Sequence, residues 1–131
     1  MQFREPKYNT ITKENINEMV IRFYTKILSQ EDNEVAKVFK NKLGETLDEP
    51  HWVEHIEILT NFWSMIALQE ENYNGNPMMA HFDLPLTRDM FGDWLVMFFE
   101  TIDSMYEDRL GMVFKQRAQN IAENFMRNMR L

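Results

Sequence analysis

Apolar residues recur along this chain at the three- and four-residue spacings that are typical of amphipathic helices. Between Thr12 and Ser29 the pattern predicts a long helix that Thr12 caps and that carries Tyr24 on its buried stripe. Three later segments have the same spacing, and their apolar positions are Trp52, His55, Leu59, Phe62 and Ile66; Phe91, Trp94, Leu95, Phe98, Ile102 and Met105; and Phe114, Ala118, Ile121, Ala122, Phe125 and Met129. The pattern predicts an all-α domain with four substantial helices.

Two shorter segments and several boundaries complete this prediction. Residues 35–39 form a looser helical stretch that ends at Gly44, and Met78–Phe82 forms a short helix after a loop rich in Asn, Gly and Pro. We expect Asp48 to cap the second long helix and Gly111 to separate the third from the fourth. Residues 1–11 are expected to be an N-terminal tail, and residues 12–131 a single domain.

Composition excludes several classes of function. The 131 residues carry a net charge of −7, so the chain is poorly suited to bind nucleic acid. There is no cysteine, which excludes disulfides, thiolate metal sites and covalent attachment of c-type haem. The longest apolar run, Trp94–Phe99, is too short to span a membrane, and the N-terminus has no apolar leader. We therefore expect a cytoplasmic protein without a membrane partner.

Each of the three histidines has a structural and a functional interpretation. His81 could cap the end of its short helix or could ligate a metal in an apolar pocket. His55 could be a core residue or could line a ligand cavity opposite His81. His51, Glu54 and His55 match the H-x-x-E-H pattern of inverted zinc peptidases. That pattern is short and needs a third ligand and a substrate cleft, so we consider zinc hydrolysis the weakest alternative.

The order of these residues resembles the truncated haemoglobins, and within them the third group. The resemblance runs from about residue 12 to residue 127. Each matching stretch is weak evidence by itself, but together their order and spacing are specific to the family. The matching stretches are Phe23-Tyr24, Val38-Phe39, Glu54-His55, Asn61-Phe62-Trp63, Tyr73-Asn74-Gly75-Asn76-Pro77, His81 with Leu84-Pro85, Phe91 with Trp94-Leu95, and Gln116-Arg117-Ala118-Gln119 with Ile121-Ala122.

The resemblance implies a two-over-two helical sandwich around one non-covalent haem b. It implies that His81 binds a five-coordinate iron from the proximal side and that Phe39 stacks on the haem. The distal positions fall on Tyr24, His55 and Trp94. The expected remainder of the haem contacts is Phe23, Leu59, Phe62, Trp63, Phe82, Phe91, Met112 and Ile121, with Arg88 and Arg117 as the candidate partners of the propionates.

The implied function is the binding of dioxygen, nitric oxide and carbon monoxide. A phenol or indole that donates a hydrogen bond to dioxygen in a dry pocket slows its release, which suits redox chemistry better than oxygen storage, although oxygen transport stays among the expected functions. An alternative is therefore a haem redox enzyme, a nitric oxide dioxygenase or a peroxidase-like enzyme. Such an enzyme would use an external reductase, since the chain has no flavin or nicotinamide motif. A third alternative is a helical interaction module without a cofactor.

Overall fold

The first described helices begin where the sequence places capping side chains. The computed structural model describes residues 7–68 and 87–128. Helix α1 (Lys13–Leu28) starts after Thr12, whose hydroxyl accepts from the Asn15 amide while the Asn15 side chain accepts from the Thr12 amide. This reciprocal capping box satisfies two amide groups that the first helical turn leaves open. Asn33 caps α2 (Glu34–Leu43) in a similar way.

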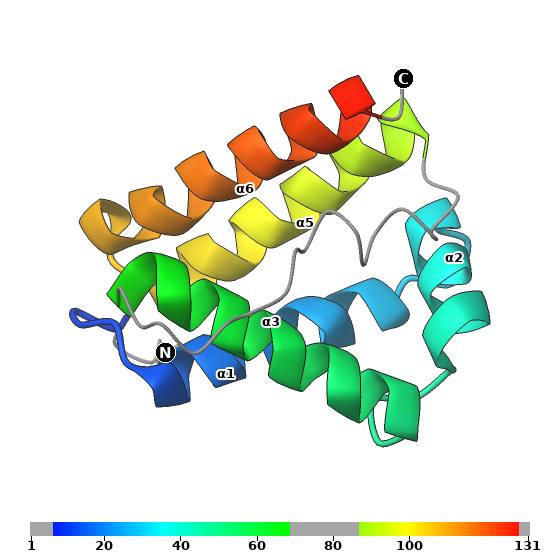
Figure 1. Cartoon of the computed structure of the whole chain (residues 1–131), viewed down its shortest axis with the longest axis horizontal. Coiled ribbons are helices and arrows are strands. Elements are labelled where there is room, and N and C mark those ends of the chain that lie inside the picture. The colour runs from blue at the N-terminus through cyan, green and yellow to red at the C-terminus, as the bar shows by residue number, and fades with distance from the viewer. Residues whose placement is uncertain (1–6, 69–86, 129–131) are drawn as a thin grey trace, which may run out of the picture.

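The remaining helices form the other half of the domain. They are α3 (Pro50–Leu68), α5 (Arg88–Met105), which Thr87 caps, and α6 (Asp108–Asn128). Helix α1 packs on α3, α5 packs beside α6, and α1 also contacts α5, so that two pairs of helices enclose the core (Figure 1). No strand occurs in residues 7–68 and 87–128, and the all-α prediction is confirmed.

Two predicted boundaries are wrong by part of a turn. Gly111 does not interrupt the chain between helices, because α6 already begins at Asp108. The amide of Gly111 donates to the carbonyl of Glu107 at 2.9 Å, as an ordinary first-turn residue does. Asp48 does not stand next to the helix, because α3 begins at Pro50 and Glu49 precedes it. The Asp48 carboxylate instead accepts a hydrogen bond from the Thr46 hydroxyl.

The described part of the predicted tail lies against the helices. The Tyr8 amide donates to the carbonyl of Met105 at 2.7 Å, and the Glu107 amide donates to the carbonyl of Tyr8 at 3.1 Å. The Tyr106 hydroxyl donates to the buried side-chain oxygen of Asn15, 91 residues away in sequence, at 2.8 Å. These contacts hold the start of the chain against the turn between α5 and α6.

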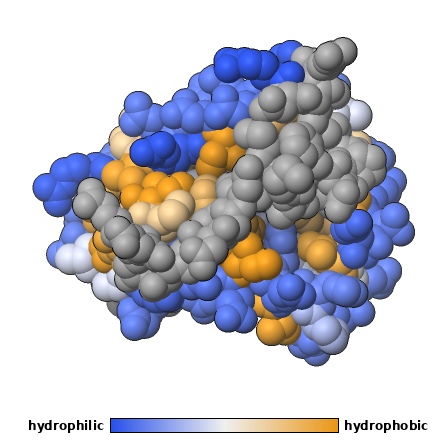
Figure 2. All heavy atoms as spheres, in the orientation of Figure 1, coloured by the Kyte–Doolittle hydropathy of each residue, from blue (hydrophilic) through white to orange (hydrophobic). Residues whose placement is uncertain are grey.

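The surface agrees with the charge of the chain. The face in Figure 2 is largely hydrophilic where described residues form it, with apolar side chains in separate patches. None of the described helices is both long enough and apolar enough to pass through a membrane.

Candidate functional site

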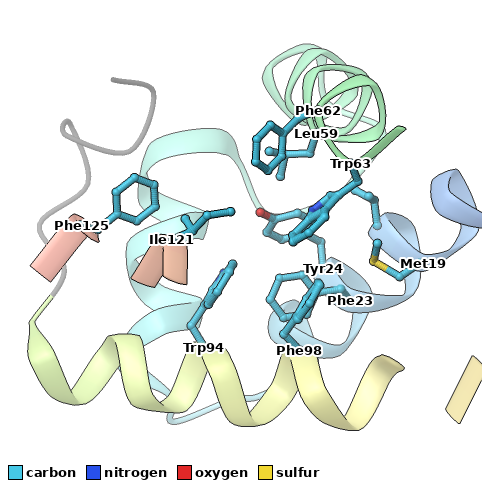
Figure 3. Close-up of a pocket in the computed structure, with 11 residues that line it drawn as sticks. Met19, Phe23, Tyr24, Leu59, Phe62, Trp63, Trp94, Phe98, Ile121 and Phe125 are labelled. Carbon is cyan, nitrogen blue, oxygen red and sulfur yellow. The ribbon is translucent and has the colours of Figure 1, made fainter. Parts of the chain in front are cut away.

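An apolar pocket lies between the two helix pairs. Its free volume is about 20 Å³, which is room for about one water-sized molecule. Side chains from α1, α3, α5 and α6 surround it (Figure 3). The lining residues are Met19, Val20, Phe23, Tyr24, Leu59, Phe62, Trp63, Trp94, Phe98, Ile121 and Phe125.

Tyr24 places a polar group in this apolar lining. The side chain is fully buried, and its hydroxyl oxygen lies 3.1 Å from His55 Nε2, within hydrogen-bond distance. Which of the two groups donates depends on which imidazole nitrogen carries the proton. Burial raises the pKa of the phenol well above its ordinary value, because the low-dielectric surroundings disfavour the phenolate. Tyr24 therefore keeps its proton at physiological pH and remains able to donate it in a hydrogen bond.

Two tryptophans bring further donors to the pocket. Trp63 is almost fully buried, and Trp94 is half-buried and points from α5 into the pocket (Figure 3). Trp94 stacks on Phe98 with ring centroids 5.6 Å apart and meets Phe23 edge-on at 5.5 Å. Within the described residues, neither indole N–H makes a hydrogen bond to the protein. The two indoles therefore place N–H donors among the residues that line the pocket.

The pocket brings together half of the site residues that the sequence singled out. Seven of the predicted residues lie in its lining, and His55 contacts one of them from outside: the seven are Phe23, Tyr24, Leu59, Phe62, Trp63, Trp94 and Ile121. Phe39 is buried beside the same group, with its ring 5.4 Å from that of Tyr24, but it is not part of the lining. Phe91 is also buried and reaches the lining through Phe125 at 6.0 Å.

Other predicted positions do not reach the pocket. Met112 is 56% exposed, because Gly111 and Phe114 take the buried positions on this part of α6. The expected contribution of Met112 to a dry lining is therefore wrong. Arg88 and Arg117 are both exposed. His81 and Phe82 lie outside the described residues.

Four lining residues were missing from the predicted site. Met19, Val20, Phe98 and Phe125 each stand four positions from a residue that the prediction contained, namely Phe23, Tyr24, Trp94 and Ile121. One helical turn separates the members of each pair, so they share a face. Extending each predicted contact by one turn would have found them.

The zinc alternative has no support in the described residues. His51 is exposed, whereas His55 turns inward to Tyr24. Across residues 7–68 and 87–128, no three His, Asp or Glu side chains gather closely enough to hold a metal ion.

Comparison with known proteins identifies the family. The chain is 38% identical over 120 residues to the group 3 truncated hemoglobin ctb of Campylobacter jejuni, covering 91% of each protein. The chain belongs to the group III truncated haemoglobins. Its structure is also similar to the crystal structure of a group III truncated hemoglobin from Campylobacter jejuni, with a TM-score of 0.82, 36% identity and coverage of 95% of this chain and 94% of that one. No family model matches the chain.

Membership in this family confirms the predicted truncated-globin fold. In this globin, α1 and α3 carry Tyr24 and His55 on one side of the pocket, and α5 carries Trp94 on another. The candidate site of this truncated haemoglobin is therefore a small apolar cavity with four side chains capable of hydrogen bonding at or beside it, namely Tyr24, His55, Trp63 and Trp94.

Proposed function

We propose that this truncated haemoglobin binds haem b against the pocket and holds dioxygen, nitric oxide or carbon monoxide beside Tyr24 and Trp94. The observation that carries the proposal is the pair of possible donors in the apolar lining, the buried Tyr24 hydroxyl and the Trp94 indole, around a space of about 20 Å³. The apolar lining with few polar groups suits a small uncharged ligand. Haem held here would supply an iron atom with affinity for diatomic ligands, and His81 is the residue that would hold that iron.

The described residues have the chemistry that a porphyrin requires. Aromatic and aliphatic side chains dominate the lining, and they exclude water from a flat apolar ring. We assign the iron to the imidazole of His81, by the resemblance of its position to the proximal histidine of the family. Phe82, by the same family resemblance, and Phe39 and Phe91 behind the lining complete the proposed contacts.

The distal side chains set how long a ligand stays. Burial raises the pKa of the Tyr24 phenol, so it stays protonated at physiological pH and offers a neutral donor to the negative end of a polar diatomic ligand. His55 holds the Tyr24 hydroxyl in place and stands between it and the partly exposed surface of α3. A hydrogen bond of this kind contributes about 1 kcal/mol, which slows ligand release by about fivefold.

Absorption spectroscopy and release kinetics test the proposal. The purified protein, or the protein after addition of hemin, should show a Soret band that shifts when carbon monoxide binds the reduced form. Tyr24→Phe and Trp94→Phe should each release dioxygen about fivefold faster in stopped-flow measurements. Tyr106→Phe is the matched control, since it removes a buried phenol hydroxyl outside the pocket. A protein that takes up no haem, or unchanged release in both pocket variants, would contradict the proposal.

A further inference from the structure

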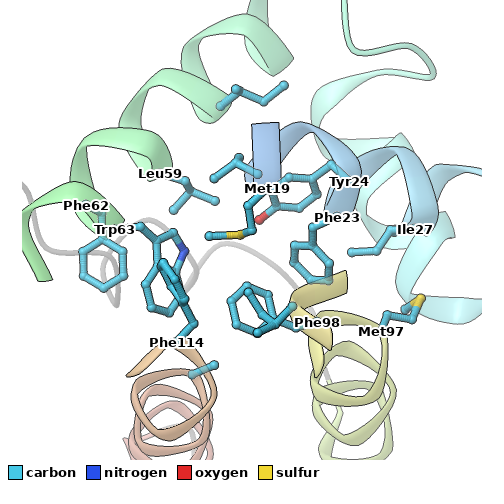
Figure 4. Packing of buried hydrophobic residues seen from close by; sticks show 14 of the residues in the cluster. Met19, Phe23, Tyr24, Ile27, Leu59, Phe62, Trp63, Met97, Phe98 and Phe114 are labelled. Carbon is cyan, nitrogen blue, oxygen red and sulfur yellow. The ribbon is translucent and has the colours of Figure 1, made fainter. Parts of the chain in front are cut away.

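A continuous path of aromatic rings connects the pocket with the surface. Ring centroids of neighbours on this path are between 4.9 and 5.9 Å apart. Figure 4 shows its central members, Trp63, Phe98 and Phe114, gathered where α3, α5 and α6 meet. From the pocket outward the rings are Trp94, Phe98, Trp63, Phe114, Tyr106 and Tyr8.

The order of ring types on this path suits the movement of single electrons. Tryptophan and tyrosine are the aromatic side chains that lose one electron most readily. Single phenylalanines separate Trp94, Trp63 and Tyr106, and Tyr106 contacts Tyr8 directly. Phe98 lies between Trp94 and Trp63, almost parallel to both, with interplanar angles of 3° and 18°. Phe114 stacks on Tyr106 at 4.9 Å and 30°. Electrons therefore have short steps between oxidisable rings.

Only the outer end of the path has a base for the phenolic proton. Oxidation of a tyrosine makes its hydroxyl strongly acidic, so the radical is stable where a proton acceptor is in contact. The Tyr8 hydroxyl donates to the Glu18 carboxylate at 3.0 Å, and Tyr8 is 38% exposed. The Tyr106 hydroxyl is buried and donates to the Asn15 amide oxygen, which is not a base. An oxidised Tyr106 would therefore take an electron from Tyr8.

A second group of rings near the pocket leads inward. The Tyr24 ring lies 5.0 Å from Trp52 and 5.4 Å from Phe39. Trp52 and Phe39 are both fully buried, and the Trp52 N–H donates to the carbonyl of Gly44 at 2.7 Å. This branch offers no ring at which a donor from solution could deliver an electron.

We propose that the path ending at Tyr8 delivers electrons to the pocket, and that Tyr8 is a surface site at which small one-electron donors such as ascorbate or phenols are oxidised by hydrogen peroxide. The inference rests on the proposed binding of haem. Hydrogen peroxide in the pocket takes up two electrons and two protons and becomes two molecules of water. Each electron leaves Tyr8 along the path while the Tyr8 O–H bond breaks and Glu18 takes the proton. One donor molecule then returns an electron and a proton to Tyr8 and becomes a radical, so two donors are oxidised for each peroxide.

The location of the protein radical tests this assignment. The haem-loaded ferric protein is mixed with hydrogen peroxide without a donor, frozen rapidly and examined by electron paramagnetic resonance. A parallel sample is digested, and mass spectrometry locates dityrosine cross-links. We expect a tyrosyl radical and cross-links through Tyr8, both of which disappear when ascorbate is added. Tyr8→Phe should abolish these cross-links.

Three variants separate electron transfer from packing. Tyr106→Phe keeps a ring against Tyr8 but removes the oxidisable group, and it should abolish the Tyr8 cross-links while haem uptake stays unchanged. Glu18→Gln removes the proton acceptor and should reduce the Tyr8 radical. Trp52→Phe, on the inward branch and outside the pocket lining, should leave the Tyr8 cross-links in place.

Each contrary result overturns a defined part of the reasoning. A radical that stays on Tyr24, or Tyr8 cross-links that persist in Tyr106→Phe, would overturn the path while the proposed haem binding stands. If hydrogen peroxide leaves the ferric absorption spectrum unchanged, the proposed path is also overturned, because nothing in the pocket would then accept electrons from it. A protein that takes up no hemin would remove both proposals, and absorption before the peroxide step reveals this case.

Discussion

Replacing Gly111 by alanine is expected to destabilise the protein, although alanine is the better helix former. Within a helix, alanine is favoured over glycine by about 0.5–1 kcal/mol. At Gly111, however, an added Cβ would lie only 2.9 Å from Ile102 Cγ2, where α6 passes over α5. Ile102 is fully buried and β-branched, so this methyl group cannot turn away freely. Overpacking of this kind costs about 1–3 kcal/mol, which exceeds the gain in helix propensity.

Gly92 provides the matched control for this substitution. It lies in α5, and no atom stands within 4 Å of the position that its Cβ would take. Gly92→Ala should therefore stabilise the protein by about 0.5–1 kcal/mol, the opposite sign from Gly111→Ala. A difference in stability between Gly111→Ala and Gly92→Ala therefore reports the close approach of two helices at Gly111, and not the general effect of replacing a helical glycine.

Urea unfolding followed by far-ultraviolet circular dichroism measures both effects. With a slope of about 2 kcal/mol per molar urea, a change of 1 kcal/mol moves the midpoint by about 0.5 M. The variants must be compared at equal haem content, because a ligand of the native state adds stability. Ile102→Leu moves the branch of the side chain away from the backbone, so it should rescue Gly111→Ala in a double-mutant cycle. Equal stabilisation by the two alanines would refute the reasoning.

Two further predictions concern ionisation and haem ligation. Burial raises the pKa of both Tyr24 and Tyr106 above the ordinary value of about 10, so the unfolded chain loses these protons at a lower pH than the folded one. The free energy of unfolding should therefore fall as pH rises above about 10, and urea midpoints should fall less steeply with pH in Tyr24→Phe and Tyr106→Phe; parallel profiles would contradict this. His81→Ala should lose haem or change the spin state of the iron in absorption spectra, and added imidazole should restore the original spectrum. If His55→Ala behaves in this way instead, the proximal and distal assignments are reversed.

The helical spacing of apolar residues was enough to predict the helices, because the residues at those positions are the ones that the structure buries. Thr12 begins α1 as predicted, and Tyr24 lies on the buried stripe between Val20 and Leu28. The errors occur where a residue type has two uses. Gly111 was interpreted as a helix breaker, but in the structure it allows two helices to approach closely. The contact with Ile102 joins residues of different helices, and spacing along one helix contains no information on it.

The pocket likewise depends on contacts between helices, which spacing along one helix does not predict. A helical stripe shows that Trp94 and Phe98 share a buried face, but not whether that face meets another side chain or an empty space. The family resemblance supplied this second fact for Tyr24 and Trp94, because it carried the position of a cavity along with the residue types. It did not supply the hydrogen bond of Tyr24 with His55, which joins positions 31 residues apart and depends on how α1 crosses α3. The Tyr8 end of the aromatic path lies before the resemblance begins. The position of Tyr8 at the end of this path follows from its backbone hydrogen bonds with Met105 and Glu107, which only the folded chain reveals.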